Sequence, residues 1–276
     1  MENNNGIYQA ILRQVYKNGE QCDVCGTDML GYRNRDNSDF CPNCAAENMR
    51  EREHEIVEDR YQSSLRARQR GDFYKYSIFG GIRNKIPELT FENYKAVDTE
   101  TTNAKEIAQK VVENYSESNI DNVLLNGNTG VGKTHLAVSV LNGILALDPS
   151  LRGQFVNYAE LLEMSKHFDN RETKLYVNDE VFREMKTADV VVIDDLGAEL
   201  GDFSEQKIKS TNYNTSFVNR IFEARIGKLT LYTTNLTGNQ LKKVYGGRIV
   251  SRLFEGLTYI NFTNTTDKRM NKVRSD

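Results

Sequence analysis

The sequence of 276 residues contains no tryptophan, only three prolines and no apolar run near the roughly 20 residues that cross a bilayer. Its net charge of −3 gives no overall basic field for nucleic acid, so any such contact would need a local patch. The polar N-terminus shows no signal-peptide pattern, and the sequence holds no internal repeat or low-complexity tract. We therefore expect a cytoplasmic protein without a membrane partner.

Cysteine is confined to one end of the chain. Two Cys-x2-Cys pairs, Cys22/Cys25 and Cys41/Cys44, are separated by fifteen residues, and this spacing is typical of a four-thiolate zinc ribbon. Two disulfides or free buried thiols are the alternatives, but disulfides are rare in the cytosol. We predict a structural Zn²⁺ site, and because four protein thiolates fill the coordination sphere, we expect no catalysis at the metal.

A glycine-rich stretch matches the phosphate-loop pattern G-x-x-x-x-G-K-[ST] in full. An apolar run precedes it and a helix-forming run follows, which predicts the strand, loop and helix that phosphate binding needs. A chance glycine turn is the alternative, disfavoured by these flanks. Lys133 would reach the β- and γ-phosphates, and the Thr134 hydroxyl would hold Mg²⁺. The residues predicted to bind ATP or ADP here are Gly127, Asn128, Thr129, Gly130, Val131, Gly132, Lys133, Thr134 and His135.

A second motif consists of two carboxylates after an apolar run. Val190–Ile193 is unbroken and β-branched, as expected for a strand buried on both faces of a parallel sheet. Asp194 and Asp195 follow at its carboxyl end, where ligands bind in open α/β sheets. Asp194 suits a Mg²⁺ ligand, and Asp195 suits the residue that orients or deprotonates the attacking water. A strand ending in polar turn residues is the alternative.

Two further segments carry polar residues suited to ATP hydrolysis. The β-rich run Leu229–Thr234 leads to Asn235. If this strand lies beside the one ending in Asp194, the amide can orient the attacking water, whereas a turn asparagine is the ordinary alternative. Arg248 and Arg252 are four residues apart and share a face of a predicted helix. An arginine there could stabilise transition-state charge on a neighbouring subunit's nucleotide; surface arginines paired with local carboxylates are the alternative.

The remaining patterns indicate how the chain is organised. A short amphipathic helix is expected over 7–16, and residues 45–70, rich in glutamate and arginine, predict one charged helix. Strands and helices then alternate, which predicts an α/β fold with a parallel sheet and helices on both faces. The expected strands are 120–125, 154–157, 189–194, 229–234 and 257–262. The expected helices are 101–115, 133–147, 158–168, 175–186, 204–225 and 247–254.

Taken in order, the motifs resemble those of a known family. Gly-Asn-Thr-Gly-Val-Gly-Lys-Thr-His-Leu-Ala, Val-Ile-Asp-Asp-Leu-Gly, Thr-Thr-Asn-Leu and Gly-Gly-Arg-Ile-Val-Ser-Arg-Leu are similar to the AAA+ ATPases of the DnaC/DnaI helicase-loader group, over residues 80–276. The resemblance implies Walker A at 127–134, Walker B at Asp194 and Asp195, sensor 1 at Asn235, an arginine finger at Arg252 or, second, Arg248, and a sensor 2 arginine at Arg269.

The chain also departs from the usual family pattern. The water-activating acid is an aspartate, whereas most AAA+ proteins use glutamate. Because few residues follow Arg269 in this sequence, we expect a truncated lid and no helix-turn-helix. The segment 158–186 is similar to the insertion of the initiator clade, which can meet DNA.

The resemblance further implies three regions and a function. Residues 1–70 would form a zinc-binding module that includes the charged helix, and this module would bind the replicative DnaB-family helicase. Residues 71–90 would form a linker, and residues 91–276 would form an AAA+ ATPase domain with a truncated lid. The protein would load that helicase onto single-stranded DNA at replication initiation. Hydrolysis would be slow and stimulated by a partner or DNA, DNA binding weak, and self-association would use the AAA+ domain.

Two other functions compete with helicase loading. An IstB-like transposition helper is the first alternative, although such helpers generally lack the zinc module. A zinc adaptor whose ATP site only sets conformation is the second. Loaders with this N-terminal module are typical of Gram-positive bacteria and their phages, so the resemblance is compatible with either a host or a phage origin.

Overall fold

The computed structural model describes residues 14–33, 39–116, 122–166, 171–200, 211–254 and 256–268. The chain divides into two compact units, Met1–Ser64 and Leu65–Asp276, and helix α2 (Pro42–Tyr76) contributes residues to both. In the described part of the chain, no helix combines the length and the apolar character that a membrane span requires.

The first unit is built on a hairpin that leads into a helix. Strands β1 (Val15–Gln21) and β2 (Asp28–Tyr32) pair antiparallel, with Val15 opposite Tyr32. A bridge from Leu30 to Phe40 then brings the chain back beside β2. The prediction of a helix over 7–16 is wrong at its C-terminal end, because residues 15 and 16 lie in β1. Residues 1–13 lie outside the described part of the chain.

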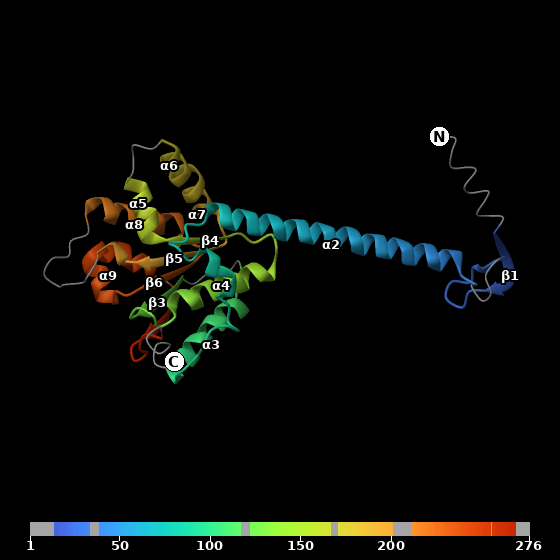
Figure 1. The fold of residues 1–276 in the computed structure, drawn as a ribbon, viewed down its shortest axis with the longest axis horizontal. Helices are drawn as coiled ribbons and strands as arrows, with labels where there is room; N and C mark the ends of the chain where they lie inside the picture. Colours follow the sequence, from blue (N-terminus) through green and yellow to red (C-terminus); the bar gives the residue numbers. More distant parts are fainter. Residues whose placement is uncertain are drawn as a thin grey trace. The chain divides into compact units, whose positions relative to one another are not determined.

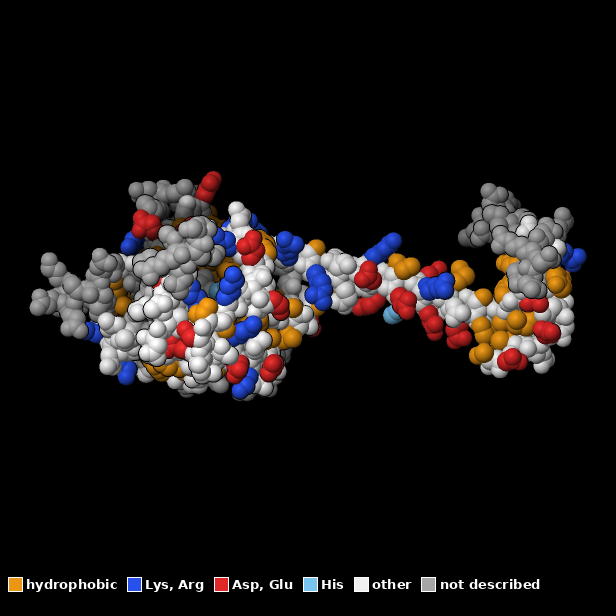
Figure 2. Space-filling view, turned by 60° about the horizontal axis from the view of Figure 1, so that its bottom comes forward, with side chains coloured by type: hydrophobic (Ala, Val, Ile, Leu, Met, Phe, Trp, Pro, Cys, Tyr) orange, Lys and Arg blue, Asp and Glu red, His pale blue; other side chains and the backbone are white. Residues whose placement is uncertain are grey.

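The charged helix expected over 45–70 is confirmed and is longer at both ends, as α2. Acidic side chains are prominent along its first-unit part in the space-filling view (Figure 2). Its few large apolar side chains there are exposed: Met49, Ile56, Val57 and Tyr61. In the second unit α2 becomes partly buried, and Phe73 packs into the core.

The second unit contains a five-stranded parallel sheet in the order β4-β5-β6-β3-β7. This order inserts β6 between the strand before the phosphate loop, β3, and the strand that carries the two carboxylates, β5. The strands are β3 (Asn122–Gly127), β4 (Gly153–Asn157), β5 (Val190–Leu196), β6 (Leu229–Thr234) and β7 (Leu257–Phe262).

Helices cover both faces of the sheet, as predicted (Figure 1). One face packs against α3 (Thr99–Glu113) and α4 (Lys133–Leu147). The other packs against α5 (Tyr158–Lys166), α7 (Phe182–Thr187), α8 (Asn212–Ala224), α9 (Gly238–Tyr245) and α10 (Gly247–Leu253). Shorter elements are η1 (Arg83–Glu88), α6 (Arg171–Leu175), the π-helical turn η2 (Tyr176–Val181) and η3 (Ala198–Leu200).

Strand β5 shows why the sheet has two apolar faces. Its side chains alternate between the two cores, with Val190 and Val192 on the α3/α4 side and Val191 and Ile193 on the other. All four are 0% exposed. A strand that is buried on both faces therefore reads as an unbroken apolar run.

Some helices differ from the expectation. Helix α9 was not expected, although Thr237 and Gln240 form a capping box at its start. The segment 158–186 is divided among α5, α6, η2 and α7. Helix α8 is described from Asn212, and the expected start at 204 lies outside the described residues.

Residues 71–90, expected to link the two regions, contribute side chains to the α3/α4 core. Phe73, Phe79 and Ile86 are each under a tenth exposed. The boundaries 1–70, 71–90 and 91–276 remain a prediction.

Candidate functional site

The glycine-rich stretch forms a tight loop between β3 and α4, as its flanks predicted. Gly130 and Gly132 have φ of 82° and 104°, which side chains rarely adopt, and Gly132 is the N-cap of α4. A Cβ at Gly132 would lie 2.8 Å from the ring of Tyr94. The N-terminus of α4 therefore opens on a loop of backbone N–H groups, which is a geometry that binds phosphate.

Lys133 is 5% exposed, and its contacts join two of the predicted motifs. Its Nζ donates to the carbonyl oxygens of Gly127 and Asn128, at 2.7 and 2.8 Å, and to the Oδ1 of Asn235, at 2.7 Å. Asn235 follows β6, which lies beside β5 as its predicted role requires. A phosphate oxygen bound in the loop would compete with these acceptors for the Lys133 amine.

Asp194 lies at the meeting point of the phosphate loop and two strands. The hydroxyls of Thr134 and Thr233 donate to its Oδ1 at 2.8 and 2.7 Å. Burial, together with the neighbouring charge of Asp195, raises the pKa of Asp194 to about 6. A buried carboxylate beside a loop threonine is a suitable pair of ligands for Mg²⁺, whose charge would favour the ionised form.

Asp195 adopts an unusual backbone conformation. Its φ is 56°, the only positive value at a non-glycine among the described residues. Its N–H donates to the Thr233 hydroxyl at 2.9 Å, and the β5–β6 register shifts between Ile193 and Leu196. Aspartate tolerates this region better than most residues, and such strain clusters at functional sites. Asp195 is partly exposed, whereas Asp194 is buried.

His135 is bound to the segment before α3. Its Nε2 lies 2.8 Å from the carbonyl oxygen of Thr90, and its ring meets that of Tyr94 edge-on at 5.2 Å. Burial lowers the pKa of His135. The His135 side chain therefore packs residues 90–94 against α4, next to the phosphate loop.

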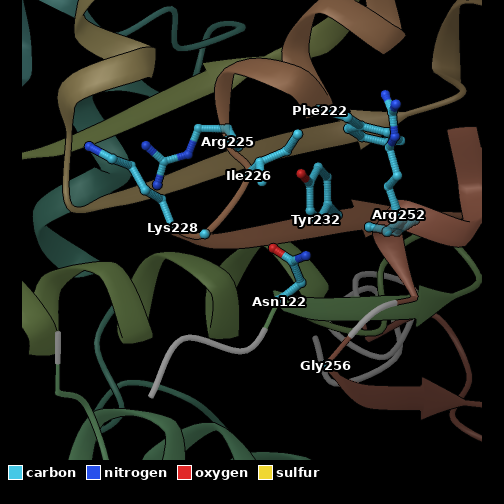
Figure 3. A pocket seen from close by; sticks show the side chains of 10 residues that line it. Asn122, Phe222, Arg225, Ile226, Lys228, Tyr232, Arg252 and Gly256 are labelled. Atoms are coloured by element: carbon cyan, nitrogen blue, oxygen red, sulfur yellow. The ribbon is translucent and has the colours of Figure 1, made fainter. Parts of the chain in front are cut away.

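Arg252 lies far from the phosphate loop of its own chain. Arg252 faces a pocket that Asn122, the first residue of β3, also lines (Figure 3). Six residues of β3 separate that edge from the loop, a rise of about 16 Å. Arg252 lies 3.2 Å from both Asn219 Oδ1 and Glu223 Oε1, and Arg248 is exposed. Arg252 therefore pairs with a local carboxylate, as the alternative interpretation expected. If Arg252 contacts nucleotide, the nucleotide must be bound to a neighbouring molecule.

Arg269 lies outside the described residues, but the residue before it touches the phosphate loop. The backbone N–H of Lys268 donates to the Gly130 carbonyl at 3.2 Å, and its Nζ donates to the Lys95 carbonyl at 2.8 Å. This contact could not be predicted from local sequence, because the two segments come together through the pairing of β7 with β3.

The four cysteines of the first unit converge. Their Sγ atoms all lie within 4.8 Å of one another, and all four are free thiols. The separations Cys22–Cys44 and Cys25–Cys41 are 3.7 and 3.3 Å, close to the about 3.8 Å between thiolates in a tetrahedral site with Zn–S bonds of 2.3 Å. The cluster could therefore hold one tetrahedral metal ion, and the disulfide alternative is not what the structure shows.

Comparison with known proteins identifies the family. The model of the IstB-like ATP binding proteins matches residues 79–253. The crystal structure of the DnaC helicase loader is similar with a TM-score of 0.53 at 22% identity, covering 65% of this chain and 99% of that one. The crystal structure of DnaI gives 0.52 at 21% identity, covering 68% and 95%.

A curated relative is the chromosomal replication initiator protein DnaA of Thermosipho melanesiensis, 32% identical over 49% of this chain and 28% of that protein. The chain spans about 28–39% of the length of the curated initiators that it matches.

The predicted fold class is confirmed, and so is the resemblance to the DnaC/DnaI group. The chain belongs to the IstB-like ATP-binding proteins and is an ATPase with the AAA+ fold.

Proposed function

We propose that the protein is an ATP-dependent loader of a replicative hexameric helicase of the DnaB family, acting on single-stranded DNA when replication begins. The observation that carries the proposal is the combination, in one chain, of a four-cysteine module with a nucleotide-binding AAA+ unit. The likeness of the second unit to DnaC and DnaI over almost the whole of those chains supports it.

The proposed chemistry assigns each residue of the site a task. Lys133 holds the β- and γ-phosphates, and Thr134 and Asp194 hold Mg²⁺. Asp195 and Asn235 orient and activate the attacking water at the carboxyl edge of the sheet. Magnesium would neutralise the developing phosphate charge when bound.

Hydrolysis in this scheme depends on a neighbouring copy. Arg252, with Arg248 as second choice, would reach the neighbour's nucleotide, while Arg269 would contact the nucleotide of its own chain. Turnover is therefore slow in the isolated protein and rises with self-association. Single-stranded DNA binds weakly, since no overall positive charge attracts it.

The first unit is the proposed contact with the helicase, and the four thiolates bind Zn²⁺. The test is co-purification of the full chain with a hexameric DnaB-type helicase. A stable complex is expected for the wild type and for Lys133→Ala, and its loss is expected for the double variant Cys22→Ser/Cys41→Ser, which should still bind ATP. A complex that forms equally well with the double variant would contradict the assignment of the first unit.

A transposition helper is the second candidate, because the matching family model is named after IstB. Such a protein would hold a transposase rather than a helicase. Parallel co-purification with the two partners separates the candidates. Retention of transposase, with no retention of helicase, would favour the helper and overturn the loader.

A further inference from the structure

The segment Thr263–Lys268, which we name the strap, follows β7 and runs beside the phosphate loop. Strand β7 pairs with β3 so that Phe262 lies opposite Gly127, the first residue of the loop. The strap therefore starts at the edge of the sheet where phosphate binds. The arginine predicted as sensor 2, Arg269, directly follows the strap, and no role was predicted for the strap residues themselves.

One end of the strap is fixed by Glu100, in the first turn of α3. Its carboxylate accepts hydrogen bonds from the backbone N–H groups of Thr263 and Thr265, at 2.7 and 2.8 Å, and from both of their hydroxyls. The N–H of Asn264 adds a contact at 3.2 Å. These donors outweigh desolvation and hold the pKa of Glu100 at about 2, so the anchor stays ionised throughout the physiological range.

The other end of the strap lies on the phosphate loop itself. The N–H of Lys268 donates to the Gly130 carbonyl, and the carboxylate of Asp267 packs against Gly130 so closely that a Cβ there would overlap it. Lys268 directs its Nζ to the Lys95 carbonyl and over the ring of Tyr94, 4.2 Å from its centroid. The strap thus places a carboxylate against the loop that must receive a polyanion.

We propose that Asp267 lowers the affinity of the phosphate loop for nucleotide by electrostatic repulsion, and that Glu100 is the positioning residue that keeps Asp267 there. The inference rests on nucleotide binding at Gly127–Thr134 and is independent of the helicase partner. With the carboxylate in this position, the contact costs binding energy whenever a phosphate enters the loop. Release of bound nucleotide is correspondingly faster.

The test measures association and dissociation rates of a fluorescent ADP with the full chain by stopped flow. Asp267→Asn should lower the Kd about threefold to tenfold, with a gain that shrinks as salt is raised. Asp59→Asn, an exposed change in α2, is the matched control and should leave the Kd unchanged. Glu100→Ala should also lower the Kd, while Glu106→Ala, on an exposed position of the same helix, should not.

The double variant distinguishes positioning from a structural role. In the Asp267→Asn background, Glu100→Ala should have little further effect on Kd, because no carboxylate remains to be positioned. An unchanged or higher Kd for Asp267→Asn would overturn the proposal, and so would an effect of Glu100→Ala that is equal in both backgrounds. If the wild type bound no ADP while Asp267→Asn did, repulsion would be supported in its strongest form. If neither bound, the nucleotide site itself would be contradicted.

Discussion

The two units differ in what stabilises each of them, a four-cysteine cluster in the first and buried apolar side chains in the second. Among the described residues of the first unit, Cys41 is the one hydrophobic residue that is buried, at 8% exposed, and it belongs to the four-cysteine cluster. The second unit buries two extensive apolar cores against the faces of one sheet. A small module that cannot bury enough surface needs a covalent or metal constraint, whereas the larger unit is stabilised by burial. Each unit should therefore respond to changes that leave the other intact.

Metal removal should give the largest effect, and only in the first unit. Cys22→Ser/Cys41→Ser should abolish metal binding and unfold residues 14–64, because metal contributes about 10 kcal/mol or more to folding of such modules. The measurement is metal content by mass spectrometry together with amide hydrogen exchange. One equivalent of zinc in the wild type and none in the variant is expected. A variant that retained one metal ion per chain would rule out the four-thiolate assignment.

The second unit should be most sensitive at a buried cation, Arg225. Its side chain is 2% exposed and donates to the carbonyl oxygens of Met185, Ala188 and Leu229 and to the Thr230 hydroxyl. Arg225→Met should destabilise the second unit by about 3 kcal/mol, since several buried acceptors lose their donor. Denaturant unfolding should show the loss, while the zinc content stays at one. A loss under 0.5 kcal/mol would mean that the acceptors find other partners.

The strained aspartate should separate stability from activity. Asp195→Gly relieves a positive φ and should raise the stability of the second unit, by up to about 1 kcal/mol, while ATP turnover is lost. Asp195→Asn is the control that keeps a residue tolerant of this conformation, so turnover should fall without the gain in melting temperature. If the glycine variant melted lower than the asparagine variant, strain at this position would be excluded.

The smallest effect is a pH dependence at His135. Burial depresses its folded-state pKa below the unfolded value of 6.5, so this contribution to stability is present above pH 6.5 and is lost as pH falls through the folded pKa. The second unit should therefore be slightly less stable at pH 5 than at pH 7 from this source. His135→Gln should reduce the slope of melting temperature against pH over that range. An identical slope in wild type and variant would show that His135 does not contribute.

Much of the site could be predicted because its motifs are local in sequence. Glycine and threonine spacing fixed the expected loop, and the apolar run before Asp194 identified a central strand. The role of Asn235 was conditional on the neighbour of its strand, and the order β5-β6-β3 satisfies that condition. The positive φ of Asp195 could not be predicted, because the register shift against β6 imposes it.

Contacts between segments distant in sequence could not be predicted either, because they too depend on how the strands pair. Glu100 and Thr265 are 165 residues apart and meet only after β7 pairs with β3. Arg252 has a local partner in Glu223, 29 residues away, which the sequence offered only as the alternative. A motif within one loop can be recognised from the sequence, whereas contacts between loops depend on the order of the strands in the sheet.

Calorimetric titration with ATP and excess magnesium tests the central claim, that an independently stable nucleotide-binding unit is joined to a module held by metal. The account predicts one nucleotide per chain for the wild type, the same for Cys22→Ser/Cys41→Ser, and none for Lys133→Ala. Wild-type protein that gives no binding, or a cysteine variant that loses it, would contradict the account.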